Sequence, residues 1–213
     1  MLSDRSSSFD SQFGVDTTGI IPMWRMQIDS ENAKFGVQYQ PTSQDELRAA
    51  VAFLGADTAR FHFVDLGCGK GRALLIAAQA GFSRVTGVEF APELARIARS
   101  NLAKMAIRNA TVIDGDAAQF SFPDGPLVVY AFNPFGPQVM AQVIENLRRH
   151  ADGDLYLIYS EPKHAHLMDA SGFLESLGKV PGYPSVQVWQ GRQQAYPNPG
   201  HDSLDDGHGR PAA

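Results

Sequence analysis

Three glycines follow closely on an acidic residue, a pattern that can build a binding site from backbone groups. The segment Phe63–Arg72 reads FVDLGCGKGR, so Gly67, Gly69 and Gly71 come after Asp65. A short apolar run precedes the glycines and an apolar helical pattern follows them. Glycine allows sharp turns and leaves backbone N–H groups accessible, and a helix that starts there presents its positive end. The segment therefore predicts a strand–turn–helix unit that binds a nucleotide-like cofactor at a sheet edge.

Two classes of cofactor compete for this turn. A dinucleotide site has the pattern G-x-G-x-x-G, but Arg72 stands at the third glycine position and Gly71 comes one residue early. The dinucleotide pattern also has no use for the carboxylate of Asp65. S-adenosylmethionine carries an ammonium group, a ribose diol and a sulfonium but no pyrophosphate, so its site can use acids. An NAD(P)-dependent oxidoreductase and a non-catalytic cofactor-binding domain remain the alternatives, the latter because no catalytic base is evident.

The segment Asp65–Gly71 resembles the first motif of the class I S-adenosylmethionine-dependent methyltransferases, and the resemblance extends over residues 39–192. It implies S-adenosyl-L-methionine as the cofactor, with Asp65 on or near its ammonium group. The loop residues that it implies around the methionine part of the cofactor are Gly67, Cys68, Gly69 and Gly71.

The same resemblance assigns further cofactor-binding residues. Glu89, at the end of the second expected strand, corresponds to the acid that accepts hydrogen bonds from both ribose hydroxyls. Asp116 corresponds to the residue that receives the adenine amine, and Ala117 to the one that offers a backbone N–H. The remaining residues implied at the cofactor are Phe90 after the second strand, and Tyr39 and Thr42 before the first.

The segment Asn133-Pro134-Phe135 follows the fourth expected strand, where the methyl acceptor would lie. It resembles the Asn/Asp-Pro-Pro-Tyr/Phe motif of methyltransferases acting on amino or amide nitrogen, but it lacks the second proline. An amide oxygen can hold the N–H groups of an amine and direct its lone pair, and an adjacent aromatic ring can shield the approach. These three residues are the predicted catalytic residues, and Asn133 is also expected at the cofactor. The alternative is that Asn133-Pro134 only ends a strand.

The wording of the first motif, together with Gly-Val-Glu-Phe at residues 87–90, resembles protein lysine methyltransferases of the Dot1-like and ATP-synthase-c-subunit-modifying kind. The function expected from the sequence is therefore methylation of a nitrogen on a protein side chain or a small molecule.

Alternating strand and helix patterns must position these residues. Apolar runs predict strands at residues 61–66, 84–89, 111–113, 127–132 and 155–159, with helical patterns between them. Runs at 173–180 and 185–190 flank a Pro-Gly-Tyr-Pro turn and predict an antiparallel pair. The expected fold is α/β: a doubly wound, mostly parallel, seven-stranded Rossmann-like sheet that ends in this pair.

At 213 residues, 44% of them hydrophobic, the chain is expected to form one domain. We assign residues 13–196 to a single methyltransferase domain, in which residues 13–57 form an N-terminal cap segment. Residues 1–12 are expected to be mobile and residues 197–213 to be a disordered tail, because both are poor in large apolar side chains.

The composition and charge of the chain limit the kinds of binding partner that we expect. A net charge of −5 offers no global attraction to nucleic acid, so a nucleic-acid partner is not expected. No apolar run approaches the roughly 18–20 residues of a membrane span. A single cysteine excludes an internal disulfide, and a cytoplasmic location is expected. The lone His164-x-His166 pair predicts no metal site. The expected partner is a protein or small-molecule methyl acceptor, and the sequence carries no signal for an oligomeric state.

Overall fold

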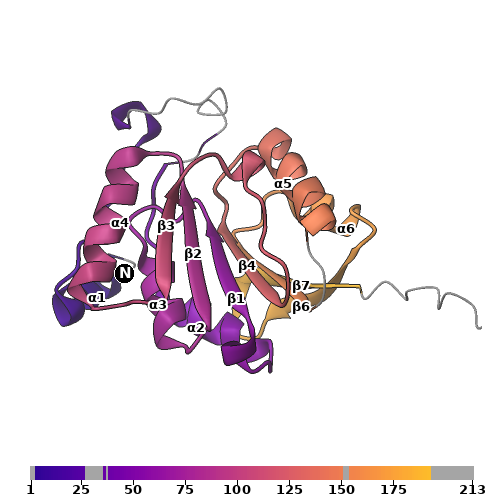
Figure 1. Cartoon of the computed structure of the whole chain (residues 1–213), viewed down its shortest axis with the longest axis horizontal. Helices are drawn as coiled ribbons and strands as arrows, with labels where there is room; N and C mark the ends of the chain where they lie inside the picture. Colours follow the sequence, from indigo (N-terminus) through magenta and orange to yellow (C-terminus); the bar gives the residue numbers. More distant parts are fainter. Residues whose placement is uncertain (1–2, 27–35, 37, 151–153, 193–213) are drawn as a thin grey trace, which may run out of the picture.

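The computed structural model of the chain describes residues 3–26, 36, 38–150 and 154–192. At its centre lies a seven-stranded sheet with the order β3-β2-β1-β4-β5-β7-β6 (Figure 1). The strands are β1 (His62–Leu66), β2 (Arg84–Glu89), β3 (Ala110–Asp114), β4 (Leu127–Phe132), β5 (Leu155–Ser160), β6 (Leu174–Val180) and β7 (Tyr183–Gly191). Strands β1 to β5 pair in parallel, and β7 runs antiparallel to both β5 and β6. The predicted α/β fold with its terminal antiparallel pair is confirmed.

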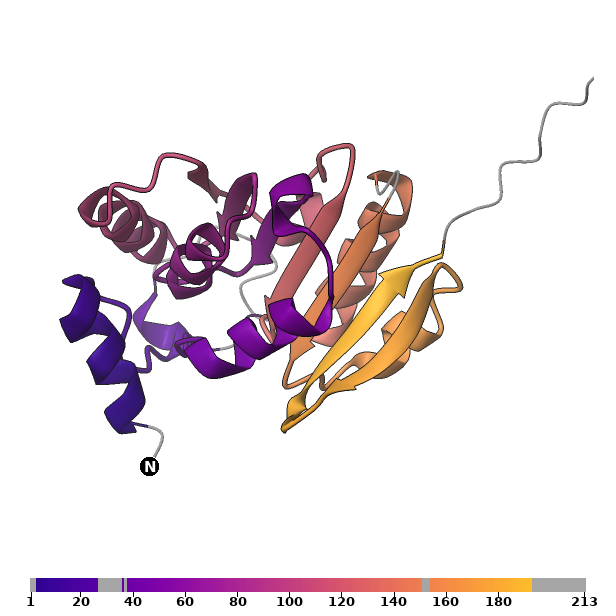
Figure 2. The ribbon, with the colours of Figure 1, turned by 90° about the horizontal axis from the view of Figure 1, so that it is seen from below.

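Helices cover both faces of the sheet. The helices are α1 (Ser3–Phe13), α2 (Gln44–Phe53), α3 (Arg72–Gln79), α4 (Pro92–Lys104), α5 (Pro137–His150) and α6 (Ala165–Asp169). Apolar side chains of α2 and α3 pack on one face of the sheet, and those of α5 and α6 on the other. Figure 2 shows α2 and α5 on opposite sides of the sheet. The sheet is therefore doubly wound, and its parallel strands are apolar on both faces.

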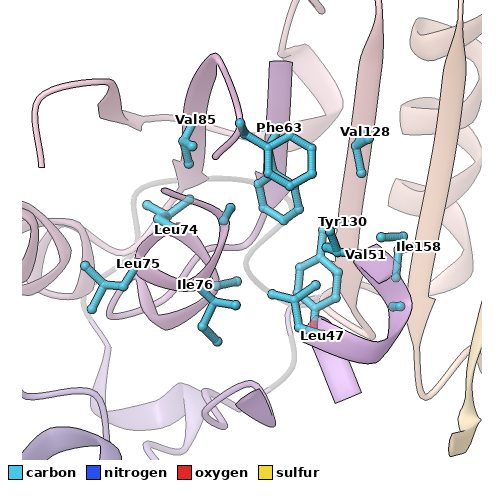
Figure 3. Packing of buried hydrophobic residues seen from close by; sticks show 14 of the residues in the cluster. Leu47, Val51, Phe63, Leu74, Leu75, Ile76, Val85, Val128, Tyr130 and Ile158 are labelled. Atoms are coloured by element: carbon cyan, nitrogen blue, oxygen red, sulfur yellow. The ribbon is translucent and has the colours of Figure 1, made fainter. Parts of the chain in front are cut away.

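The alternation of side chains along each strand separates the two cores. In β1, Phe63 packs in the core on the α2 and α3 side, whereas the next residue, Val64, packs in the core below α5. The ring of Phe63 lies 6.0 Å from that of Tyr130 on β4, between the sheet and α3 (Figure 3). Asp65 lies on the same face of β1 as Phe63, next to the last residue of the strand, and is buried.

The helix that precedes the sheet begins at a capping-box sequence, Ser43-x-x-Glu46. The Ser43 hydroxyl accepts a hydrogen bond of 3.4 Å from the backbone N–H of Glu46 and caps α2. The Glu46 carboxylate instead accepts a hydrogen bond of 2.9 Å from the Ser185 hydroxyl on β7. Only one half of the capping box is therefore formed, and the other half is exchanged for a contact between α2 and the C-terminal strand pair.

The N-terminal segment, which the sequence predicts to be mobile over residues 1–12, contains a helix. Residues 3–13 form helix α1, in which Phe9 is only 1% exposed and packs in the core beside α3. Phe9 and Phe13 lie one turn apart, with ring centroids separated by 4.9 Å, and give a serine-rich helix its apolar side. The expected tail at residues 197–213 lies outside the described residues. Within the described ranges, no helix is long and apolar enough to cross a membrane.

Docking of α1 is tested by Phe9→Ala. The substitution removes a fully buried ring, so we expect the free energy of unfolding to fall by about 3 kcal/mol. The matched control is Gln12→Ala, an exposed position on the same helix, which should change stability by less than about 0.5 kcal/mol. Equilibrium denaturant unfolding measures both variants. A Phe9→Ala variant as stable as the parent would show that α1 is not part of the cooperative fold.

Candidate active site

A cavity of about 180 Å³ lies at the carboxyl ends of β1, β2, β4 and β5. Most residues predicted from the sequence line it: Tyr39, Thr42, Asp65, Gly67, Cys68, Glu89, Phe90, Asn133, Pro134 and Phe135. A second pocket, of about 10 Å³, adjoins it and holds the other predicted pair, Asp116 and Ala117, together with Gly67, Phe90 and Phe135. The structure thus brings the predicted residues to one edge of the sheet, as expected for strands that run in parallel.

The loop between β1 and α3 has a backbone that requires glycine. Gly67, Gly69 and Gly71 have φ angles of 77°, 54° and 85°, in the left-handed region that other residues avoid. The N–H groups of Gly67 and Cys68 donate to the Val88 carbonyl on β2 at 2.9 and 3.1 Å, which ties the loop to the neighbouring strand.

Close packing also keeps side chains off this loop. A Cβ atom on Gly69 would lie 2.3 Å from the Tyr39 ring, and one on Gly71 would lie 3.0 Å from Ala98 on α4. Gly69 and Gly71 therefore line neither of the two pockets described above. They allow Tyr39 and α4 to approach the loop.

Two buried carboxylates stand at the inner wall of the cavity. Glu89 accepts hydrogen bonds from the N–H groups of Gly69 at 2.7 Å and Ala91 at 2.9 Å. Burial raises the pKa of Glu89 to about 7, although these backbone hydrogen bonds oppose the change. Burial, and the nearby Glu89 charge, also raise the pKa of Asp65 well above its usual range. Both acids would be better accommodated with a cation or hydroxyl donors in the cavity.

Asn133 ends β4 in an uncommon conformation. Its φ is 37°, and its side chain is buried and accepts a hydrogen bond of 3.5 Å from the Tyr159 hydroxyl to Oδ1. Phe135, two residues further, forms an isolated antiparallel bridge with Gly36. Thr42 is held from the same strand, because the Tyr130 hydroxyl donates to Thr42 Oγ1 at 3.3 Å. The end of β4 and the segment before α2 therefore meet at the cavity.

Asp116 has a structural partner in this state. It caps the short 3-10 helix Ala117–Gln119 by accepting a hydrogen bond of 2.9 Å from the Ala118 N–H. In the structure the residue expected at the adenine amine is thus a helix cap.

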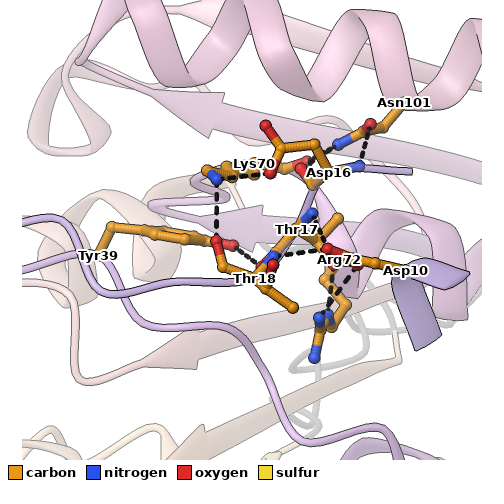
Figure 4. A network of polar contacts seen from close by, with 8 residues as sticks. All are labelled: Asp10, Asp16, Thr17, Thr18, Tyr39, Lys70, Arg72 and Asn101. Atoms are coloured by element: carbon orange, nitrogen blue, oxygen red, sulfur yellow. Dashed lines mark hydrogen bonds and ion pairs between the residues drawn. The ribbon is translucent and has the colours of Figure 1, made fainter. Parts of the chain in front are cut away.

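The two cations of the glycine loop are bound to the N-terminal segment (Figure 4). Arg72 Nε donates to the Thr17 hydroxyl at 2.6 Å, and its NH2 group forms an ion pair of 3.2 Å with Asp10. Lys70 Nζ lies 2.7 Å from the Asp16 carboxylate and donates to the Thr18 carbonyl at 2.9 Å. Arg72 thus replaces a dinucleotide-type glycine with a side chain that fastens residues 10–18 to the loop.

Further contacts complete this network. Asp10 accepts hydrogen bonds from the Thr17 hydroxyl and from two backbone N–H groups; burial raises the pKa of Asp10, but these bonds outweigh it and lower the pKa. Asn101 on α4 bonds to the backbone of both Asp16 and Lys70. The Tyr39 hydroxyl donates to the Thr17 carbonyl at 2.6 Å, so the ring that covers Gly69 belongs to the same network.

Several residues of the cavity were not predicted. These are Met26, Gln38, Arg72, Leu94, Phe132, Glu161 and Lys163. Of these, Glu161 could have been found from the sequence, because it is the first residue after the fifth strand and thus occupies the position that Asn133 occupies after the fourth. Among the described residues, no group of three or more potential metal ligands is found.

A comparison with known protein families identifies the domain that carries this site. Residues 63–153, which span the glycine loop, the acid of β2 and the end of β4, match a family model described as a methyltransferase domain. The chain therefore contains a methyltransferase domain, with the fold of the class I S-adenosylmethionine-dependent enzymes. It is an enzyme whose cofactor is S-adenosyl-L-methionine. The match supports a methyltransferase over the oxidoreductase and non-catalytic alternatives considered from the sequence.

Solved structures show the same fold at low sequence identity. The methyltransferase is similar to magnesium protoporphyrin IX methyltransferase from Synechocystis PCC 6803 with bound S-adenosylmethionine (21% identity, TM-score 0.53, 69% of this chain and 77% of that one). It is also similar to an RNA methyltransferase from Salinibacter ruber in complex with S-adenosyl-L-homocysteine (19%, 0.51, 70% and 91%). A third similar structure is that of mitomycin 7-O-methyltransferase (18% identity, TM-score 0.54, 70% of this chain), and the chain spans 54% of the length of that protein. No curated protein sequence matches the chain.

The Arg72–Asp10 pair is tested by a double-mutant cycle with Arg72→Met and Asp10→Asn. The side chains of Arg72 and Asp10 are only 4% and 13% exposed, so we expect a coupling of about 1–3 kcal/mol in the free energy of unfolding. The matched control is the exposed Arg99–Asp114 pair, at 2.7 Å, whose coupling should stay below about 1 kcal/mol. Denaturant unfolding of each set measures the coupling. Equal couplings for the two pairs would contradict a role for Arg72 in fastening the N-terminal segment.

Proposed function

We propose that this methyltransferase transfers the methyl group to a nitrogen, on a protein side chain or a small molecule. The observation that carries the proposal is the position of Asn133: a buried amide in the left-handed region, at the end of β4, lining the same cavity as Asp65 and Glu89. Its Oδ1 atom accepts the N–H of the acceptor, and the Tyr159 hydroxyl, on the same oxygen, holds the amide in place.

The cofactor is bound in the proposed site as follows. Asp65 takes the ammonium of the methionine part, and the Glu89 carboxylate accepts hydrogen bonds from the ribose hydroxyls. This assignment is supported by the burial of both acids and by the free lone pairs that each Glu89 oxygen retains after accepting one backbone N–H. The adenine lies at the smaller pocket, near Asp116 and Ala117. This position is supported by the pocket's lining, which includes both residues and shares Gly67 and Phe90 with the main cavity.

The remaining contacts enclose the cofactor. Gly67, Cys68 and the loop around Gly69 run along the methionine part. Tyr39 and Thr42 cover it from the segment before α2, and Phe90 covers it from the end of β2. This arrangement is supported because all of these residues except Gly69 line the cavity. Gly69 contributes by leaving space for the Tyr39 ring.

The chemistry asks little of the protein beyond alignment. The nitrogen lone pair attacks the methyl carbon in line with the breaking S–CH3 bond, the sulfonium becomes a thioether, and the nitrogen proton passes to solvent. Asn133 directs the lone pair, Pro134 restricts the backbone beside it, and Phe135 excludes water from the line of attack. The burial of Asn133 and Phe135 supports these roles.

The acceptor class is tested by incubating the protein with methyl-labelled S-adenosylmethionine and a fractionated lysate of its source. We expect label in the protein or small-molecule fraction, bound through a linkage that resists mild base and is recovered as a methylated amine. Label in nucleic acid, or label released as methanol by base, would contradict methylation of a nitrogen in these acceptors.

The substitution Asn133→Gly distinguishes the role of the Asn133 side-chain amide from that of its left-handed backbone. Glycine accepts a φ of 37° without strain, so the variant keeps the strand end but lacks the amide. We expect it to bind S-adenosylhomocysteine like the parent, while methyl transfer to the lysate acceptor falls about 100-fold or more, as for the loss of one transition-state hydrogen bond. Full activity of this variant would favour the alternative, in which Asn133 only ends the strand.

Cofactor affinity should depend on pH through Glu89. Its pKa of about 7 in the free protein means that the carboxyl is protonated below neutral pH, and the protonated form cannot accept both ribose hydroxyls. We expect the affinity for S-adenosylhomocysteine, measured by calorimetry, to fall as the pH decreases from 8 to 6, by up to about tenfold per unit below the pKa. Glu89→Gln should bind more weakly and lose the dependence in this window. An unchanged pH profile in Glu89→Gln would exclude Glu89 as its source.

A further inference from the structure

Tyr39 joins the cofactor cavity to the N-terminal segment. It lines the cavity, and its ring packs so closely on the loop after β1 that a Cβ atom on Gly69 would have no room. Its hydroxyl donates to the Thr17 carbonyl at 2.6 Å, and its backbone exchanges two hydrogen bonds, of 2.9 and 3.1 Å, with Ile21. Residues 17–21 therefore hold the ring over the loop.

The ring depends on these polar contacts because it packs outside both main cores of the sheet. Tyr39 belongs to a small separate cluster with Ala91 and Leu94, against which Ile21 and Met26 also pack. Such a small apolar cluster offers less burial than the cores beside the sheet. The hydroxyl and backbone hydrogen bonds are thus a large part of what fixes the position of Tyr39.

Thr17 is itself fixed by two charged side chains (Figure 4). It is 0% exposed, and its hydroxyl accepts from Arg72 Nε at 2.6 Å and donates to the Asp10 carboxylate. The same carboxylate accepts the Thr17 N–H at 2.7 Å and the Thr18 N–H at 2.8 Å. Asp10 lies on α1, so the turn that carries the partner of Tyr39 is ordered by the docked helix.

A chain of direct contacts therefore runs from α1 to the cofactor site. Asp10 contacts Thr17, Thr17 contacts Tyr39, and Tyr39 packs on Gly69. The Gly69 N–H in turn donates to Glu89, the carboxylate proposed to bind the ribose, at 2.7 Å. Neither Asp10 nor Thr17 is among the described residues that line the two pockets, so any effect of theirs on the cofactor must pass through Tyr39 and the loop.

We propose that Asp10 and Thr17 are positioning residues for the cofactor: they hold the Tyr39 ring against Gly69, so that docking of α1 and binding of S-adenosylmethionine favour each other. The inference rests on the proposed placement of the cofactor along residues 67–71, and it is independent of the choice of acceptor. Because such coupling is reciprocal, a change that releases α1 weakens cofactor binding, and bound cofactor stabilises docked α1 by the same factor.

The first test measures the affinity for S-adenosylhomocysteine by calorimetry. Asp10→Asn removes the charge that holds Thr17, and Tyr39→Phe keeps the ring but removes the hydroxyl that bonds to Thr17. We expect each change to weaken binding about five- to tenfold. The double variant should bind about as weakly as Asp10→Asn alone, because both changes interrupt the same connection. The matched control is Asp169→Asn, which alters the acceptor of the Trp189 indole N–H away from both pockets and should bind like the parent.

The second test follows amide hydrogen exchange in α1 by mass spectrometry, with and without S-adenosylhomocysteine. In the parent we expect the ligand to slow exchange in α1 by up to about the factor by which Asp10→Asn weakens binding. In Tyr39→Phe the slowing should be smaller. If Asp10 only stabilised the helix, the exchange of α1 would be the same with and without the ligand.

Three results would overturn the inference: an affinity unchanged in Asp10→Asn, effects of Asp10→Asn and Tyr39→Phe that multiply in the double variant, or exchange of α1 that does not respond to the ligand. Glu89→Gln distinguishes this from failure of the proposed cofactor site. Weaker binding in Glu89→Gln with an unaffected Asp10→Asn would leave the cofactor on the loop without coupling to α1. Unchanged binding in both variants would overturn the placement of the cofactor as well.

Discussion

The hydrogen bond from the Gly69 N–H to the Glu89 carboxylate joins the loop after β1 to the end of β2, and the cofactor site depends on it. The contact of 2.7 Å needs Gly69 in the left-handed region, and it needs an acid at the last residue of β2. Burial makes the charge-assisted bond stronger and the uncompensated charge costlier. Keeping Glu89 ionised in the empty site therefore costs free energy, because the carboxylate is buried. Hydroxyl donors of the cofactor would offset this cost by hydrogen bonding to the carboxylate.

The N-terminal segment is the second support of the same loop. Arg72 and Lys70 form ion pairs with Asp10 and Asp16, and the Tyr39 ring closes over Gly69. These contacts join residues more than fifty positions apart, so the loop and the N-terminal helix are ordered together. The glycine pattern thus serves packing as much as ligand contact: it makes room for Tyr39 and for α4.

The sequence predicted the sheet and most of the cavity because parallel strands end at one edge. Asp65, Glu89 and Asn133 each end or follow an apolar run, so strand order alone placed them together. It did not predict helix α1, because a serine-rich segment is ordered only through distant partners such as Arg72, which no local pattern reveals. Glu161 was missed although it directly follows β5, because the sequence analysis looked for an acceptor site only after β4.

We propose that the cofactor lies along the Gly67–Gly71 loop, with its ribose on Glu89 and its sulfur near Asn133. A crystal structure of the protein with S-adenosylhomocysteine tests this most directly. We expect both ribose hydroxyls within hydrogen-bond distance of the Glu89 carboxylate, the ammonium at Asp65, and the adenine beside Asp116. A ligand bound away from Glu89, or a ribose held by other residues with Glu89 left bonded only to Gly69 and Ala91, would contradict it.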